Sequence, residues 1–408
     1  MSYSLAEMIL AAGSIYNPTF EPQYWQVFLL TVLLLIIQST ISSMPTAWIA
    51  KFNSWGSTFN MLALVTVIIC IPAGTKNTSP RFTPSNKVWG TIGNMTNFPD
   101  GVAVLMTFVA VIWTLSGYDS PFHLSEECSN ANVSSPRAIV MIAATGGLFG
   151  WFLQLIVAYT VRDIDGVMNS SLGQPWASYL LQVMPQKTAM GILSLTIICS
   201  FFSGQGCMIA ASRVTYAYAR DGCFPFSSIW RKINPWSKTP INAVILNMVL
   251  GILMVFLVLA GDTAIGALFS IGGIAQFVAF SIPIAIRVFF VRDNRFRPGP
   301  WNLGPFSRII GAMAVLFVAL MIPILCLPSA TGKSLTPDEM NWTCLVYGAP
   351  MLAVLVWWFV DARRWFKGPK INVEHVVHGV TVEGVDPSSK SVDDEPVMGG
   401  SEIPEKVG

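Results

Sequence analysis

The sequence predicts an all-α integral membrane protein with about nine full transmembrane helices and one partial helix. Its 408 residues are 53% hydrophobic and only 11% charged, whereas soluble proteins average about 25% charged residues. A spanning helix takes about 20 mostly apolar residues. Nine windows without Asp, Glu, Lys or Arg reach that length, the third only narrowly: 25–50, 52–75, 101–118, 138–161, 188–212, 239–261, 263–286, 309–332 and 341–360.

Hydropathy predicts the helices, in chain order, at 3–15, 25–43, 58–74, 101–118 (continuing in broken form to about 129), 138–160, 189–218, 241–260, 264–290, 307–328 and 344–364. The first of these contains Glu7 and ends before it can cross a bilayer. We interpret it as the last turns of a longer helix, so the chain is expected to be truncated at its N-terminus. Residues 1–370 form the expected transmembrane domain, and 371–408, which are polar and poor in aromatic residues, a disordered cytosolic tail.

The distribution of Lys and Arg predicts the orientation, because cytoplasmic loops carry the excess of these residues. With the loop after residue 43 inside, inside loops and the membrane-proximal tail hold sixteen Lys and Arg residues, against six outside. The C-terminus is then cytosolic. Four glycosylation sequons fall in segments assigned to the outside, and the sequon at Asn132 falls inside and should be silent. The four begin at Asn77, Asn94, Asn169 and Asn341.

The apolar window 101–118 runs into a polar cluster that breaks its helical pattern. Gly117 and Pro121 lie close together there, and Pro121 removes a backbone hydrogen-bond donor. A helix broken inside a bilayer is tolerated only where its backbone faces protein or water. Many transporters use such breaks to hold a substrate near the bilayer midplane. The segment therefore predicts a transport site.

Four residues at this break are the predicted substrate-binding groups. Ser116 and Gly117 would present backbone groups to a ligand, and Trp113 and Tyr118 would stack against it. Aromatic faces attract an ammonium group through cation–π interaction. The alternative for both aromatic residues is ordinary helix packing.

Charged residues that follow the break are candidates for proton coupling or gating. A carboxylate that is taken out of water binds a proton more readily, so Asp119 is the predicted proton or cation partner, with His123 one helical turn away. Alternatively, Asp119 caps the second half-helix. For Glu126 and Glu127 we favour a gate or loop salt bridge with Arg137 or another inside-loop arginine. Arg213, which lies further along the chain, is a candidate partner for either glutamate.

Small and polar residues on three other helices predict close helix contacts. On the helix at 264–290 they also permit a pore-lining strip, and a packing role is equally compatible with them. Between Phe224 and Pro240 the sequence predicts an interfacial loop or short helix. The small and polar residues are Gly146 and Gly150; Ser200, Ser203, Gly204 and Gly206; and Ser270, Gly272, Gly273 and Gln276.

Three sequence motifs resemble those of the fungal amino acid/choline/GABA permeases, which belong to the amino acid–polyamine–organocation superfamily. They are GYDSPFHLSEECSNANVSSPRAI, SRVTYAYARDGCFP and PGPWNLGPFSR. The resemblance implies a leucine-transporter-like fold, with two inverted five-helix repeats and two further helices. This chain would lack the first two to three spans and, with them, half of the binding site. By resemblance, Trp113, Ser116, Gly117, Tyr118 and Asp119 fall on positions around substrate and gate.

The expected function is secondary active transport, in which small nitrogenous compounds such as amino acids, GABA or choline enter the cell by alternating access coupled to protons. The expected partners are a small cationic or zwitterionic substrate, a proton and the lipid bilayer, with no cofactor, metal or nucleic acid. By resemblance, the protein would reside in the plasma membrane as a multi-pass protein. The alternative is a transport-inactive truncated permease that acts as a membrane sensor or scaffold. An enzyme is not expected, because the sequence contains no G-x-S-x-G, H-E-x-x-H, P-loop or G-x-G-x-x-G motif.

Overall fold

The computed structural model describes residues 1–366 and 368, apart from 76–79, 126–127, 129, 261, 292–295, 297, 329, 333–334 and 337–339. Throughout this part of the chain the regular structure is helical, and no strand occurs. The all-α prediction is therefore confirmed. The predicted disordered tail, 371–408, lies outside the described residues.

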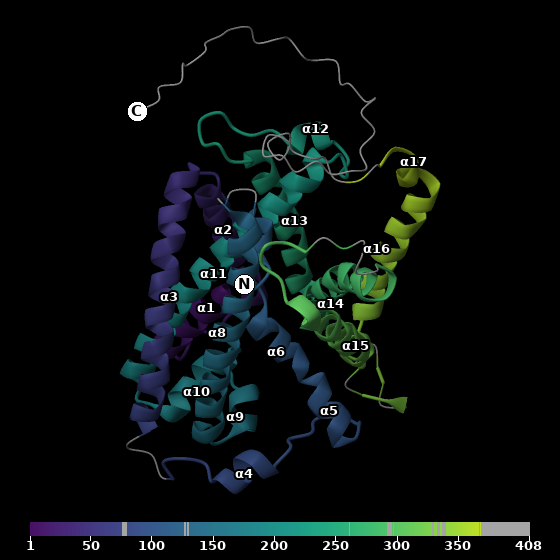
Figure 1. Ribbon diagram of the computed structural model, residues 1–408. Helices are drawn as coiled ribbons and strands as arrows, with labels where there is room; N and C mark the ends of the chain where they lie inside the picture. The colour runs from purple at the N-terminus through teal and green to yellow at the C-terminus, as the bar shows by residue number, and fades with distance from the viewer. Residues whose placement is uncertain are drawn as a thin grey trace, which may run out of the picture. The chain divides into compact units, whose positions relative to one another are not determined.

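Eight helices in the described part of the chain are long and apolar enough to cross a membrane. Together with α1 (Ser2–Tyr16), which is the predicted partial helix, they form most of the molecule (Figure 1). The eight spans are Tyr24–Ser42 (α2), Thr46–Gly74 (α3), Ala131–Thr160 (α8), Gln186–Arg220 (α11), Ile241–Leu259 (α13, Ile241–Val255, with a 3₁₀ end), Ile271–Phe290 (most of α14, Asp262–Ala285, with a π-helical end), Gly304–Leu325 (α15, Ser307–Leu325, with a 3₁₀ start) and Thr343–Trp365 (α16, Thr343–Trp357, with π-helical and α17 ends).

The ninth predicted span is shorter and interrupted. It consists of α5 (Asp100–Met106) and α6 (Phe108–Leu115), which are separated at Thr107. The four-residue helix α7 (Ser120–His123) follows after a gap. The predicted continuation in broken form is confirmed as far as α7, which ends at His123, and residues 126, 127 and 129 lie outside the described residues.

Two predicted helix starts are wrong. We expected helices from 58 and 138, but α3 begins at Thr46 and α8 begins at Ala131. Both extra segments carry a basic residue, Lys51 or Arg137. Long basic side chains can extend from a helix end to the membrane surface, so hydropathy detects only the apolar part of each helix.

Four short helices lie between the spans: α4 (Ser85–Gly90), α9 (Ile164–Met168), α10 (Pro175–Val183) and α12 (Ser227–Trp230). The last confirms the short helix, which was one of the two alternatives predicted for residues 224–240. Side chains cap two of the others, since Asp163 Oδ1 accepts a hydrogen bond from Gly166 N and Gln174 Oε1 accepts one from Ala177 N, both at 3.0 Å. Burial raises the pKa of Tyr179 in α10 to about 12.

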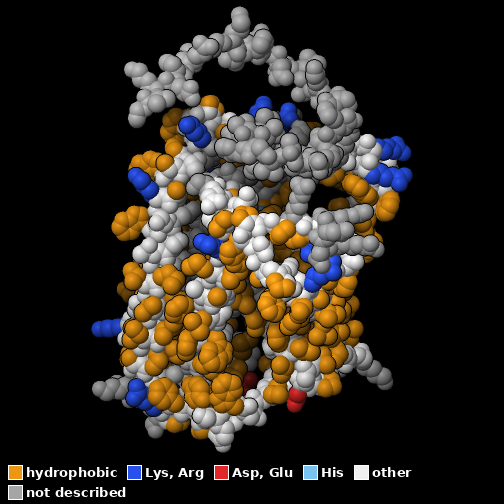
Figure 2. All heavy atoms as spheres, in the orientation of Figure 1, with side chains coloured by type: hydrophobic (Ala, Val, Ile, Leu, Met, Phe, Trp, Pro, Cys, Tyr) orange, Lys and Arg blue, Asp and Glu red, His pale blue; other side chains and the backbone are white. Residues whose placement is uncertain are grey.

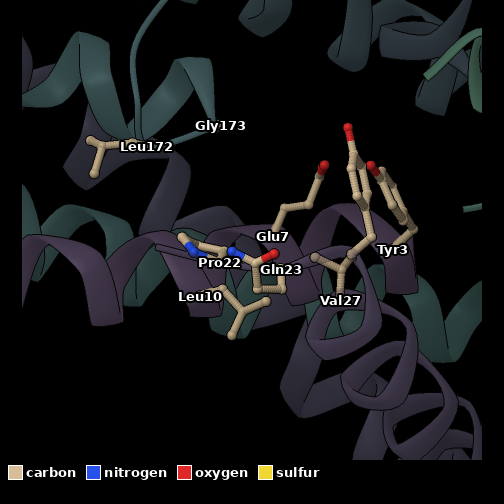
Figure 3. A pocket seen from close by; sticks show the side chains of 9 residues that line it. Tyr3, Glu7, Leu10, Pro22, Gln23, Val27, Leu172 and Gly173 are labelled. Carbon is tan, nitrogen blue, oxygen red and sulfur yellow. The ribbon is translucent and has the colours of Figure 1, made fainter. Parts of the chain in front are cut away.

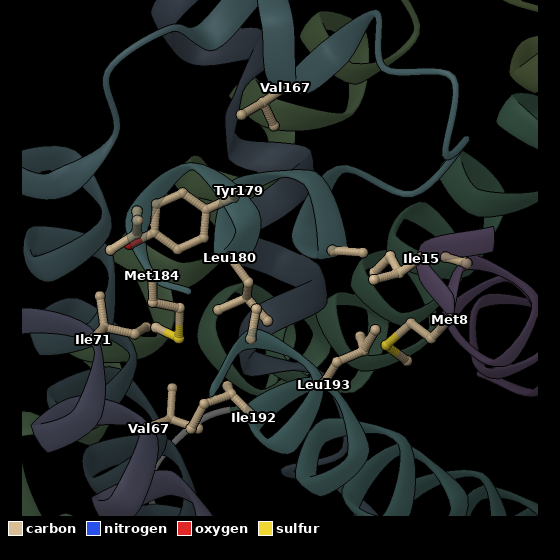
Figure 4. Close-up of a cluster of buried hydrophobic side chains, with 14 residues drawn as sticks. Met8, Ile15, Val67, Ile71, Val167, Tyr179, Leu180, Met184, Ile192 and Leu193 are labelled. Atoms are coloured by element: carbon tan, nitrogen blue, oxygen red, sulfur yellow. The ribbon is translucent and has the colours of Figure 1, made fainter. Parts of the chain in front are cut away.

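The largest buried cluster joins α1, α3, α10 and α11 (Figure 4). Ile71, Leu180 and Leu193 meet there with at most 1% of each residue exposed. Outside this cluster, hydrophobic side chains cover the visible sides of the helices (Figure 2), and many large ones are exposed, such as Trp55 and Leu62. An apolar surface of this extent fits a protein surrounded by lipid.

Candidate functional site

The chain leaves helical structure between α6 and α7, where the sequence predicted a break. Helix α6 ends at Leu115, Ser116 is extended with ψ 150°, and Gly117 has φ +91°. Glycine adopts a positive φ without the steric cost that a Cβ atom causes. The chain turns again when Ser120 N donates to Gly117 O at 3.1 Å. The break therefore exposes backbone groups that a continuous helix would use internally.

Asp119 and His123 form a polar pair at the end of this break. His123 Nε2 lies 2.9 Å from Asp119 Oδ2. The side chain of His123 is 21% exposed and that of Asp119 is 13% exposed. The carboxylate therefore meets an imidazole. The alternative that Asp119 caps the second half-helix stays open, because Asp119 is the N-cap residue of α7, although its side chain makes no capping hydrogen bond.

Three cavities border the broken segment, and each is lined by one of its predicted site residues. His123 lines a cavity of about 580 Å³, Trp113 one of about 260 Å³ and Tyr118 one of about 180 Å³. The largest of these also contains Arg213 and Lys238, so its wall is both aromatic and charged.

Trp113 packs against α14 while it lines its cavity. Its Nε1 donates to the carbonyl of Phe269 at 3.0 Å, and the two rings meet edge to face with centroids 5.6 Å apart. A Cβ atom at Gly272 would lie 2.9 Å from Cζ2 of the indole. This glycine therefore permits the close approach, and packing and cavity lining both apply to Trp113.

Ser116 and Tyr118 also meet α14. Gln276 Nε2 donates to Ser116 Oγ at 3.5 Å, and the Tyr118 and Phe280 rings lie 6.0 Å apart. Phe269 and Phe280 escaped the sequence analysis, although they recur with Gln276 at helical spacing on one face of α14. The Ser270 side chain, which was part of the predicted strip, lies outside the described residues.

Two glycines on α8 let the broken helix pack closely against it, which confirms the packing prediction for these residues. Cβ atoms at Gly146 and Gly150 would lie 3.8 Å and 3.2 Å from side chains of α6. On α11, Gly204 lies against Gln38, whose Nε2 would be 2.5 Å from an added Cβ. Gly206 differs from the prediction, because no described heavy atom lies within 4 Å of a Cβ built there.

Arg213 is nearly buried, with 7% of the residue exposed, and its Nη1 donates to Ser212 Oγ at 3.3 Å. It lines the same large cavity as His123. Its predicted partners, Glu126 and Glu127, lie outside the described residues. An ion pair between Arg213 and either glutamate therefore stays a prediction.

The four candidate glycosylation sites differ in how accessible the side-chain nitrogen is. Asn77 lies outside the described residues, and Asn169 is exposed. Asn94 Nδ2 donates to the carbonyl of Phe98 at 2.7 Å, and Asn341 Nδ2 donates to two backbone carbonyls at the end of α15 at 2.9 Å and 3.1 Å. Because a glycan is attached through this nitrogen, Asn169 is the accessible candidate in the described part of the chain.

Comparison with known proteins identifies the family to which this chain belongs. The family model for amino acid permeases matches residues 1–350. The chain belongs to this family. This permease is 54% identical over 398 residues to an uncharacterized amino-acid permease of Schizosaccharomyces pombe, with 97% of this chain and 73% of the relative covered. It is 45% identical over 392 residues to a putative polyamine transporter of Candida albicans, with 94% and 70% covered.

A plant relative is more distant. The chain is 31% identical over 350 residues to an amino-acid permease homologue of Oryza sativa subsp. japonica, with 84% of this chain and 66% of that protein covered. The chain is thus a multi-pass membrane transporter of the amino acid–polyamine–organocation superfamily and not an enzyme. These assignments confirm the class of protein that the motifs around Gly117 predicted.

Proposed function

We propose that this permease imports small nitrogenous compounds across the plasma membrane by alternating access, with transport coupled to protons. The observation that carries the proposal is the interrupted helix at Ser116–Asp119, which holds a carboxylate–imidazole pair and is bordered by cavities. The Candida albicans relative is described as a putative polyamine transporter, which favours cationic amines among the candidate substrates. Amino acids, GABA and choline share the positively charged nitrogen.

The end of α6 is suited to an ammonium group. Carbonyl groups in the last turn of a helix have no intrahelical partner, and the negative end of the helix dipole favours a cation. Ser116 and Gly117 continue the chain from that turn. Trp113 and Tyr118, on either side of these two residues, supply aromatic faces for the same charge.

The Asp119–His123 pair gives a route for proton coupling. An imidazole can accept a proton at one ring nitrogen and donate one from the other, and His123 lines the large cavity while Asp119 adjoins the break. A proton can then pass between water in that cavity and the carboxylate. Arg213 in the same wall, with Glu126 and Glu127, is our candidate for the gate on this side.

We assign the large cavity to the cytosolic side and the C-terminus to the cytosol. The support is the excess of Lys and Arg in the loops on this side, which include Lys238 in the cavity wall. We assign the segment with the exposed sequon at Asn169 to the opposite side.

Uptake in permease-deficient fungal cells tests the proposal. Cells that express the chain should accumulate at least one of radiolabelled spermidine, GABA, choline and a set of amino acids, and Asp119→Asn should reduce that uptake to background. The matched control is Asp165→Asn, in an exposed acidic residue of α9, which should transport normally. Surface expression is measured for each variant.

Absence of uptake of every compound by the unaltered chain at normal surface levels would contradict transport. That result would favour the alternative of a transport-inactive membrane sensor or scaffold. Full uptake by Asp119→Asn would leave transport in place but remove the proposed coupling role of the carboxylate.

A further inference from the structure

A separate cavity of about 270 Å³ lies between α1, the start of α2 and the loop before α10 (Figure 3). Its lining contains no residue of the broken segment. By the orientation proposed above, it opens on the outer side, where α1 ends and α2 begins. The lining residues are Tyr3, Glu7, Leu10, Pro22, Gln23, Tyr24, Val27, Leu172 and Gly173.

Helix α1 presents two different faces. One face is buried in the apolar core and includes Leu5, Ala6, Met8, Ala11 and Ile15. The other face lines the cavity with residues 3, 7 and 10, a spacing that places side chains on one side of a helix. Glu7 is the only charged residue of α1. An ionisable group in a membrane helix is costly, and it usually faces a polar cavity that serves a function.

The cavity has the chemistry of a receptor for a cation. Figure 3 shows the Glu7 carboxylate and the Tyr3 ring extending to the same side of α1. Tyr24 adds a second phenol ring, and the described lining contains no Lys or Arg. A carboxylate binds an ammonium group through a charge-assisted hydrogen bond, and aromatic faces add cation–π attraction. The same carboxylate repels the carboxylate of a zwitterion.

Aromatic contacts connect this cavity with the break. The Tyr3 ring meets Phe269 with centroids 6.2 Å apart, and Phe269 in turn meets Trp113. Tyr3 and Trp113 also line one common cavity, that of about 260 Å³. Tyr3 therefore lines both cavities, and its ring contacts connect the Glu7 cavity to Trp113 near the break.

We propose that the outer cavity is a recognition site for cationic amines, in which an ammonium group pairs with Glu7 between Tyr3 and Tyr24 before the substrate reaches the broken helix. The inference rests on the proposed function and adds to it a selection step. Compounds with net positive charge bind here in preference to zwitterions of similar size.

Binding to the full chain in lipid nanodiscs tests this site without requiring transport. The probes are radiolabelled spermidine, a cationic amine, and GABA, a zwitterion. Glu7→Gln should weaken spermidine binding roughly tenfold, as expected when a hydrogen bond between two charged groups is lost, and should leave GABA binding unchanged or tighter. Glu7→Asp should retain part of the spermidine affinity.

The matched control is Glu21→Gln. Glu21 is an exposed acidic residue next to Pro22 in the sequence, and it does not line the cavity. This variant should bind both probes as the unaltered chain does. Unchanged spermidine binding in Glu7→Gln, an equal loss for both probes, or no spermidine binding by the unaltered chain would each overturn the proposal. Because Asp119→Asn should stop uptake yet keep the Glu7-dependent binding, failure of the recognition site and failure of transport give different results.

Discussion

The helices around α11 and the broken helix α6–α7 are built in opposite ways. In α11, residues along its whole length are buried, from Ala189 to Ala219, and its neighbours α1, α3 and α10 supply a continuous apolar core. In contrast, no residue of α6 or α7 is buried. Partly buried side chains of α6, among them Val109 and Ile112, pack against a small buried cluster of α14 and α15, and aromatic contacts, glycine approaches and the carboxylate–imidazole pair add to this packing. The two regions therefore differ in burial, and we expect stability to depend mainly on the α11 region and transport mainly on the broken helix.

The bilayer explains why both arrangements are possible. Lipid tails are as apolar as a protein core, so helices associate through close packing and polar contacts and not through the hydrophobic effect. The α11 region uses close packing, as where the Phe202 ring lies over Gly56 of α3. At the break, backbone groups lack helical partners and must face protein or water, and in the proposed function they would also bind the substrate.

The largest effect is expected from Gly117→Val, which acts on the broken helix alone. A β-branched residue at φ +91° is strained, with a cost on the order of 1–3 kcal/mol. The backbone would relieve this strain by changing its conformation at the break. Uptake should fall at least about tenfold at equal surface expression, while the melting temperature of the purified protein stays close to that of the unaltered chain. Gly206→Val, at an open position on α11, is the matched control.

If Gly117→Val transported normally, the distinction between the two regions would fail, because the shape of the break would not matter. If it aggregated instead, the break would belong to the stabilising part of the molecule. Gly117→Ala, with a smaller side chain, should show the same loss of uptake to a lesser degree.

The next effect concerns stability and the opposite region. A Cβ atom at Gly56 would overlap the Phe202 ring, which also meets Phe52 with centroids 5.0 Å apart. Overpacking of this kind typically costs about 1–3 kcal/mol, so Gly56→Val should lower the melting temperature in detergent. The fraction of protein that remains folded should keep its substrate affinity.

Two further variants sharpen this result. Gly191→Val, at an exposed glycine of α11 with open space around it, should leave the melting temperature unchanged. Phe202→Ala should reduce the additional cost of Gly56→Val, because the overlapping ring is gone. A loss of stability that persists in the double variant would show that the contact with Phe202 is not its cause.

The smallest effect is expected at the contact between α14 and the broken helix. In Gly272→Ala the new methyl group would press on the edge of Trp113 and shift the indole in its cavity. We expect the KM for uptake to change about threefold with little change in melting temperature. Trp113→Phe should remove the sensitivity to Gly272→Ala, and a double variant that still shows the full shift would contradict this explanation.

Local chemistry made much of the broken segment predictable. Gly117 and Pro121 marked the interruption, and the spacing of four residues between Asp119 and His123 placed both side chains on one side of a helical turn. Their observed contact of 2.9 Å agrees with that spacing. The nearly continuous apolar windows similarly located the other spans.

Contacts between distant residues could not be predicted from one sequence. Gln276 and Ser116 are 160 positions apart, and neither the hydropathy nor the spacing of α14 indicates which helix it meets. The short helix α10 left a detectable signal, because Gln174 and Pro175 form a capped helix start. Hydropathy passed over it, since nine residues are too few to span a bilayer.

Accessibility of Ser116 measures most directly whether the broken helix is where substrate passes. In a chain whose seven native cysteines are replaced, Ser116→Cys can be labelled with a charged methanethiosulfonate reagent. We predict labelling from water, which a transported substrate slows in proportion to its occupancy. A variant that transports normally but is not labelled, or is labelled at a rate that saturating substrate does not change, would contradict a transport site at this break.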